Sequence, residues 1–88
     1  MPSITTNDPE ALLLGALAET LSDERRAIRF LDMTGIDAAT LRDRAGDPTT
    51  LGALLDFLEA YEPDLLAVAA ALNVKPEALV GARAGLSA

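Results

Sequence analysis

Leucine recurs at intervals of three and four residues along much of the chain, and that spacing places the leucines on one face of a helix. The first segment shows the pattern with Leu13, Leu14, Leu17 and Leu21. Before it, Asp8-Pro9-Glu10 combines a capping carboxylate, a proline suited to the first helical position and an acid in the first turn. We therefore expect residues 1–7 to be a flexible tail and residues 8–88 to be a single helical domain.

Further start and stop signals divide the rest of the chain. Gly35 and Asn73 stand where helices commonly end in a left-handed residue, and Asp47-Pro48 repeats the helix start of the first segment. The segment 64–72 is apolar almost all round, which predicts a central helix. Together the signals predict an all-α fold, a compact bundle of five or six short helices. After the first helix, the others are expected at 24–34, at 38–45, from Asp47-Pro48 to Pro63, at 64–72 and from Pro76 onward.

A shift of 38 residues aligns the two halves of the chain without gaps. It places Leu13 on Leu51, Leu41 on Leu79, and Gly35-Ile36 on Asn73-Val74. Identical residues are few, but the order of long helix, second helix, left-handed stop, β-branched residue and short helix is the same in both halves. We therefore expect two similar three-helix units, residues 11–46 and 49–84, packed around the fifth helix.

Composition and charge narrow the classes of function. Half of the 88 residues are apolar, and the chain contains neither histidine nor cysteine. The commonest general base, the commonest metal ligand and any thiolate nucleophile are therefore missing. Fourteen acidic against seven basic residues give a net charge of −7, which disfavours binding to nucleic-acid phosphates. We expect a protein that is not an enzyme, with no catalytic residue, no cofactor and no metal site.

The N-terminal residues and the longest apolar run bear on the compartment. Residues 1–7 have neither the basic start nor the apolar stretch of a signal peptide. The run from Leu65 to Leu72 has eight residues, whereas a membrane-spanning helix needs about twenty. The expectation is a cytoplasmic protein that does not associate with a membrane.

A spaced pattern of residues runs through most of the chain. It comprises Arg29-Phe30-Leu31-Asp32-Met33-Thr34-Gly35-Ile36, Leu41-Arg42, Asp47-Pro48, Leu55-Asp56-Phe57-Leu58, Glu62 and Leu65-Leu66. Over about residues 12–86 this pattern resembles a family of short bacterial proteins catalogued as a domain of unknown function, number 3572. Glu19-Thr20 departs from the pattern, since a more apolar pair is expected there. The resemblance implies a small helical protein with no assigned activity.

A shorter segment, residues 64–80, is similar to the closing helices of phage-repressor-type helix-turn-helix domains. In those domains the DNA-reading helix lies upstream, which here corresponds to about residues 38–55. That region carries Asp43 and Asp47 among few bases, with Asp56 next to it, so it is poorly suited to phosphate. An acidic helix-turn-helix-like regulator of nucleic acid is therefore the alternative function.

Five arginines form the candidate interaction surface. Arg25, Arg26 and Arg29 belong to the second predicted helix, and Arg42 and Arg44 to the third. Their guanidinium groups could hold a phosphate or an acidic partner, whereas the simpler interpretation is a solvated face screened by neighbouring acids. Because both lie beside strongly apolar helices, we also expect Arg42 to bridge to Glu62 and tie the two units together.

Asp56, Glu59 and Glu62 follow one another at three-residue spacing on the fourth predicted helix. Three carboxylates could bind a divalent cation, but no histidine, cysteine or glycine-rich loop accompanies them, so a solvated outer face is the better interpretation. Gly15 and Gly52 weaken otherwise good helices, which predicts close helix approach at both positions, either within the fold or against another chain.

The chain has many apolar residues for so small a volume, so leucines such as Leu12 and Leu86 are expected to stay exposed. The leading functional hypothesis is a non-enzymatic protein-protein interaction or homo-oligomerising helical module whose leftover apolar surface binds a partner helix. The partner is either a second copy of the chain or another protein. A small-molecule binder with an apolar pocket between helices is the third hypothesis.

Overall fold

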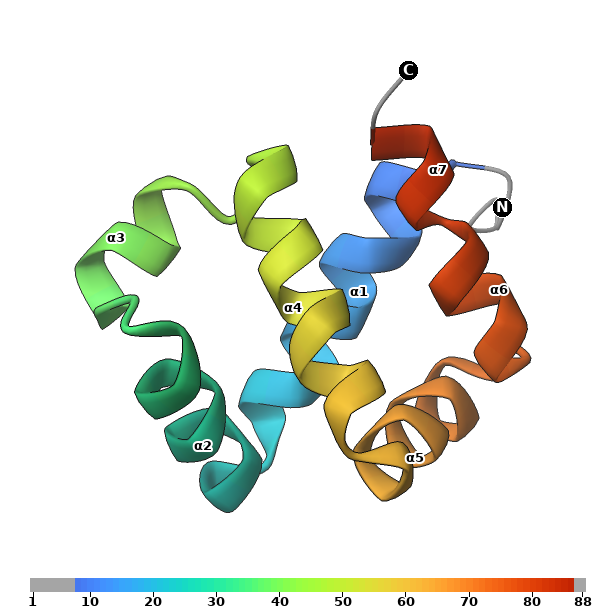
Figure 1. Cartoon of the computed structure of the whole chain (residues 1–88), viewed down its shortest axis with the longest axis horizontal. Helices are drawn as coiled ribbons and strands as arrows, with labels where there is room; N and C mark the ends of the chain where they lie inside the picture. Colours follow the sequence, from blue (N-terminus) through green and yellow to red (C-terminus); the bar gives the residue numbers. More distant parts are fainter. Residues whose placement is uncertain (1–7, 87–88) are drawn as a thin grey trace.

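The computed structural model describes residues 8–86, and the tail expected at residues 1–7 lies outside the described residues. Residues 8–86 form seven helices and contain no strand (Figure 1). The helices are α1 (Pro9–Ser22), α2 (Glu24–Thr34), α3 (Ala38–Asp43), α4 (Pro48–Ala60), α5 (Glu62–Leu72), α6 (Pro76–Gly81) and α7 (Arg83–Leu86). The prediction of an all-α bundle is confirmed. The last predicted helix is divided at Ala82 into α6 and α7.

Aspartates cap the first four helices. The carboxylates of Asp8, Asp23, Asp37 and Asp47 each accept a hydrogen bond from a backbone N–H in the first turn of α1, α2, α3 and α4, respectively. Such a cap satisfies a donor that the helix itself leaves unpaired. The start signals in the sequence therefore locate these helices to within a residue or two.

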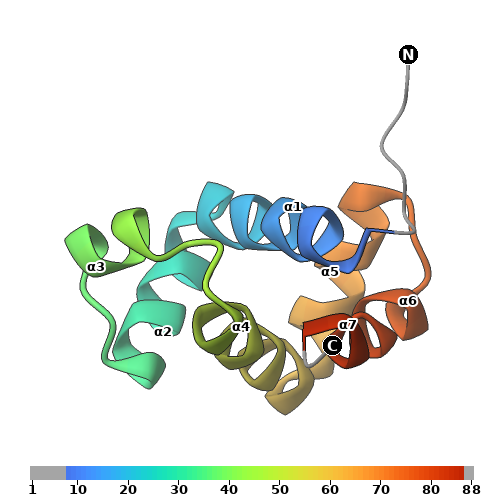
Figure 2. The same ribbon diagram turned by 90° about the horizontal axis from the view of Figure 1, so that it is seen from above.

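The centre of the core lies between α1 and α4. Figure 2 shows these two helices in the middle of the molecule, with α2 and α3 on one side and α5, α6 and α7 on the other. Leu13 of α1 and Leu51, Leu54, Leu55 and Leu58 of α4 are fully buried. Leu12, which we expected to be exposed, is also buried, and Leu86 is half-buried against the core.

The prediction that the fifth helix is central is wrong. Leu65, Val68 and Ala69 of α5 are buried, but Leu66 is 46% exposed and Ala67 is exposed as well. The physical reason is the abundance of alanine, whose small side chain tolerates water at little cost and needs no second neighbour. An all-round apolar composition therefore overstated the burial of this helix.

The two halves agree closely in their helix bounds. The bounds of α2 and α3, moved by 38 residues, become those of α5 and α6, and α1 moved in the same way matches α4 to within one residue. Gly35 and Asn73 end α2 and α5 in the left-handed conformation, with φ of 73° and 59°. This agreement supports the two predicted three-helix units, although they pack around α1 and α4 rather than around α5. Residues 38 positions apart are called counterparts below.

The length and apolar composition of the helices decide whether one of them could cross a membrane. Among residues 8–86 no single helix is long and apolar enough to span a bilayer. The segments Glu62–Leu72 and Pro76–Leu86 pass the test only when taken together, and they are bent by 96° at the break between them.

Candidate functional site

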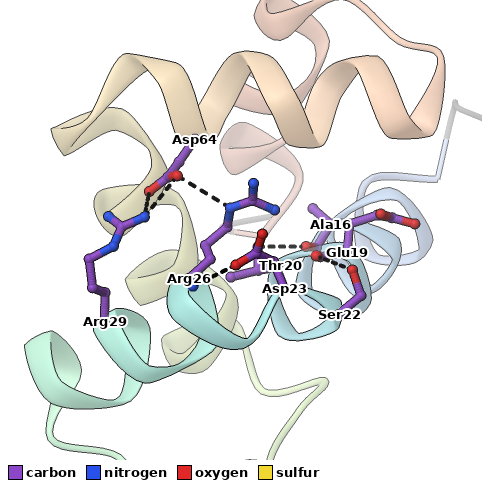
Figure 3. Close-up of polar contacts among 8 residues, drawn as sticks. All are labelled: Ala16, Glu19, Thr20, Ser22, Asp23, Arg26, Arg29 and Asp64. Atoms are coloured by element: carbon purple, nitrogen blue, oxygen red, sulfur yellow. Dashed lines mark hydrogen bonds and ion pairs between the residues drawn. The ribbon is translucent and has the colours of Figure 1, made fainter.

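Two arginines of α2 converge on one buried carboxylate of α5. Arg26 Nε donates to Asp64 Oδ1 at 3.2 Å, and Arg29 Nη2 donates to the same oxygen at 2.9 Å and lies 2.8 Å from Oδ2 (Figure 3). The Asp64 side chain is only 6% exposed. Asp23 caps α2 through the backbone N–H of Arg26, which positions the first turn of the helix for this contact and lowers the pKa of the Asp23 carboxyl.

Arg29 also lies over two aromatic rings. Its guanidinium carbon lies 5.5 Å from the centre of the Phe57 ring and 5.4 Å from that of Tyr61. Phe57 in turn meets Phe30 edge to face, with the ring centres 5.4 Å apart. Arg26 and Arg29 are therefore engaged in joining α2 to α4 and α5, and of the arginines on α2 only Arg25 has no ion pair within the described part of the chain.

The predicted bridge between Arg42 and Glu62 is not formed. Both residues are exposed, and neither takes part in an ion pair among residues 8–86. Asp64, two positions after Glu62, is the acid that faces inward. The 38-residue shift offered a signal for the contact between Arg26 and Asp64, because it aligns these two residues. When an axis relates two similar units, aligned residues that lie close to this axis can touch each other.

The acids of α4 have an arginine as their partner. Arg83 Nη2 donates to Asp56 Oδ1 at 2.8 Å and to Glu59 Oε2 at 3.1 Å, and these hydrogen bonds, with Glu59 the stronger influence, raise the pKa of Arg83. Glu62 lies outside this group. Within residues 8–86 no set of three or more acidic side chains is arranged to hold a metal ion.

Two hollows flank α3, which meets the rest of the protein mainly through Leu41, its one buried residue within the described chain. A cleft of about 520 Å³ lies between α2, α3 and α4 and is called the threonine cleft. It is lined by Met33, Thr34, Ile36, Thr40, Arg44, Asp47, Thr49, Thr50, Ala53, Asp56 and Phe57. A hollow of about 350 Å³ lies between α1, α2 and α3 and is called the leucine hollow. Its lining is Leu17, Leu21, Leu31, Ala38, Leu41, Arg42 and Ala45.

The counterpart of the threonine cleft is filled. Where the cleft has Thr34 beside Ala53, the other half has Leu72 beside Gly15, and a Cβ at Gly15 would lie 3.5 Å from the Leu72 side chain. Asp47 of the cleft likewise corresponds to Gly85. A Cβ at residue 85 would overlap the Pro9 ring, so α7 approaches α1 as closely as a glycine permits.

The counterpart of the leucine hollow is covered by charge. Leu21 corresponds to Glu59 and Ala45 corresponds to Arg83, and these two counterparts are joined by the hydrogen bond described above. Leu31 is half-buried, whereas its counterpart Ala69 is 1% exposed. Among the described residues, two openings thus lie beside α3, and the corresponding positions on the α6 side are occupied by Leu72, Glu59 and Arg83.

Arg42 and Arg44 stand at these two openings, Arg42 in the lining of the leucine hollow and Arg44 in that of the threonine cleft. Both are exposed, and no carboxylate of residues 8–86 lies within 4 Å of either guanidinium. Their counterparts are Val80 and Ala82, which carry no charge. The structure thus brings these two predicted residues to one edge, called the α3 edge, and separates them from Arg26 and Arg29.

The prediction of close helix approach within the fold at both helical glycines is wrong for Gly52, and approach of another chain there stays a prediction. A Cβ there would have no atom within 4 Å in the described residues, and at Gly15 it would meet an ordinary van der Waals contact. The closest approach is at Gly85, which sequence reasoning missed because α6 and α7 were expected as one helix.

Comparison with known proteins gives a family without an assigned activity. No curated protein and no solved structure matches the chain. The sequence profile of one family, described as "Protein of unknown function (DUF3572)", matches residues 6–88. Because the match covers nearly the whole chain, the protein belongs to this family.

Proposed function

We propose that the protein is a non-enzymatic interaction module whose α3 edge binds a partner protein. The observation that supports this proposal is the difference between the two halves. The frame of helices is the same, but the threonine cleft and the leucine hollow stay open beside α3, whereas α7 and Arg83 close the corresponding places beside α6.

The arrangement of the hollows favours a protein over a small molecule as partner. They lie on opposite sides of one six-residue helix, so a partner that covers α3 reaches both, whereas a small ligand would fill one of them. Apolar surface left open next to charged side chains is typical of sites where proteins associate. Met33, at 63% exposure, stands at the edge of the threonine cleft and adds apolar area to the same surface.

Other functions receive less support. A nucleic-acid role would use the arginines of α2, but Arg26 and Arg29 are bound to Asp64 and the net charge is −7. With neither histidine nor cysteine in the sequence, the side chains that most often carry acid-base or nucleophilic chemistry are missing. We further propose that the protein acts in the cytoplasm, where a chain without disulfides is at no disadvantage.

Photo-crosslinking in living cells tests the interaction module with controls supplied by the protein itself. A photoreactive amino acid is placed at Met33 or Thr40, both exposed and lining the threonine cleft, and in the control proteins at their exposed counterparts Ala71 and Ala78. We expect a covalent adduct of one defined mass from Met33 and Thr40 and none from the counterparts.

Two results would refute the proposal. One is formation of the same adducts from the control positions Ala71 and Ala78 as from Met33 and Thr40. The other is the absence of any protein adduct from Met33 and Thr40 while the chain is folded and abundant. Folding is checked on each purified protein by circular dichroism, so that a missing adduct cannot be attributed to loss of structure.

A further inference from the structure

The leucine hollow indicates what kind of group covers it, because the chain covers the corresponding place with its own residues. In the second half the cover is Arg83, at the start of α7, held in place by Asp56 and Glu59. Leu55 and Leu79, the counterparts of Leu17 and Leu41 in the lining of the hollow, are fully buried. The cover is thus a long side chain that projects from a short helix, and charged groups fix its position.

The first half lacks each component of that cover. Arg83 is replaced by Ala45, and the acids Asp56 and Glu59 are replaced by Ala18 and Leu21. The walls of the hollow are consequently apolar, with Leu21 36% exposed. A charged side chain entering here would lose its water without gaining a partner, whereas an apolar side chain would remove leucine surface from water.

Arg42 supplies the one charge in this lining. It stands where the second half has Val80, and it has no ion pair among residues 8–86. A group that covers the hollow lies beside this guanidinium and gains from carrying a carboxylate there. The neighbouring Arg44 lies on the other side of α3, where Asp47 and Asp56 also line the threonine cleft, so the leucine hollow is the place where an arginine meets only apolar neighbours.

We propose that the leucine hollow and Arg42 together bind an acidic amphipathic helix of the partner protein. A leucine-sized side chain of that helix enters the hollow between α1, α2 and α3, and a carboxylate next to it pairs with Arg42. This inference rests on the proposed function, since it names the chemistry of the partner at the α3 edge.

The test uses two designed peptides as probes and the full-length protein labelled with ¹⁵N. Each peptide is a capped helix of about 16 residues with leucines at three- and four-residue spacing. In one peptide the remaining face carries glutamates, and in the control peptide lysines replace the glutamates. Amide chemical shifts of the protein are followed during titration with each peptide.

Three variants locate the binding. The double variant Leu21→Glu/Ala45→Arg transplants the charged cover of the second half onto the leucine hollow, and Arg42→Val introduces the counterpart Val80. Leu66→Glu makes the same chemical change as Leu21→Glu at another exposed leucine, which lies outside the hollow. The thermal unfolding of each variant is recorded before titration, so that binding is compared only between folded proteins.

We expect the glutamate peptide to shift the amides that line the leucine hollow and to bind more tightly than the lysine peptide. The double variant should weaken binding at least about tenfold, because it removes the burial of a leucine-sized group. Arg42→Val should weaken binding of the glutamate peptide about two- to fivefold, because it removes a surface ion pair. The same variant should not weaken binding of the lysine peptide. Leu66→Glu should bind like the wild type.

Several results would overturn the proposed occupant. They are the absence of shifts at millimolar glutamate peptide, equal binding of the lysine peptide, and unchanged binding by the double variant. Shifts that depend on protein concentration alone and vanish in the double variant would identify a second copy of the chain as the occupant instead. If the peptides fail while Met33 and Thr40 still crosslink to a protein, the interaction module stands and only the acidic helix is wrong. If both experiments fail, both proposals fall.

Discussion

Removal of the Asp64 carboxylate should destabilise the protein more than removal of any exposed acid. In Asp64→Asn, Arg26 and Arg29 lose the negative charge that holds α2 against α5. Breaking a buried pair by removing one partner typically costs about 3–5 kcal/mol. Arg29 is 44% exposed on its side chain and Arg26 17%, so water compensates part of the loss and the full figure does not apply.

We therefore expect Asp64→Asn to lower the free energy of unfolding by about 2 kcal/mol. For a domain of this size that change corresponds to a fall in melting temperature of about 8–16 °C. Thermal unfolding followed by circular dichroism measures it at constant pH and salt. The matched control is Asp56→Asn, which removes a carboxylate 73% exposed from its pair with Arg83 and should cost no more than about 1 kcal/mol.

A double variant distinguishes the loss of the ion pair itself from the cost of leaving a buried charge without a partner. Arg26→Met/Asp64→Leu replaces the more buried ion pair with apolar groups, and such replacements are often neutral. It should be more stable than Asp64→Asn, although one further side chain has changed. If Asp64→Asn melts within about 2 °C of the wild type, the two arginines hold nothing together and the reasoning is refuted.

Three further outcomes follow from the packing. Gly85→Ala should destabilise by about 1–3 kcal/mol because its Cβ overlaps the first residue of α1, whereas Gly52→Ala, with open space around it, should stabilise by about 0.5–1 kcal/mol; urea unfolding compares them. Leu41→Ala should cost about 2 kcal/mol and its fully buried counterpart Leu79→Ala about 4 kcal/mol in the same assay, since the hollow beside Leu41 lets its surroundings relax; equal costs would contradict the difference between the halves. The Thr40 amide lowers the pKa of the Asp37 carboxyl below its ordinary value of 3.8, so its contribution is present above pH 3.8 and lost as the pH falls further; Asp37→Asn should therefore show a smaller drop in melting temperature between pH 5 and pH 3 than the wild type.

Local signals in the sequence predicted most of the fold. Asp8-Pro9 and Asp47-Pro48 mark helix starts, and Gly35 and Asn73 mark stops, because each of these residues satisfies a need of the backbone at its own position. Such needs are met by near neighbours in the chain. They are therefore visible without knowledge of the tertiary structure, which is why the starts of the first four helices were predicted to within a residue or two.

The errors concern contacts between distant elements. Glu62 and Asp64 are both acids in the first turn of α5, and only the packing of α2 against α5 decides that Asp64 faces inward. The same holds for the exposed face of α5 and for the open space at Gly52. Periodicity places residues on one face of a helix, but it does not state which other helix covers that face. Residue spacing alone therefore could not predict which acid pairs with a given arginine.

The sequence pattern singled out Arg42 and Arg44 but not the two hollows beside them, which the repeat makes interpretable once the structure is known. Each short helix buries one leucine, Leu41 in α3 and Leu79 in α6. However, α6 packs against α1, α4 and α5, whereas α3 has no comparably extensive contact with another described helix. The side chains that would close the first unit are present in the second as Leu72, Glu59 and Arg83. An open hollow leaves its lining atoms without neighbours, so folding gains nothing from it. The double variant Leu21→Glu/Ala45→Arg should therefore leave stability unchanged or raise it while weakening binding at least about tenfold. That combination distinguishes a surface kept open for a partner from one that the fold requires.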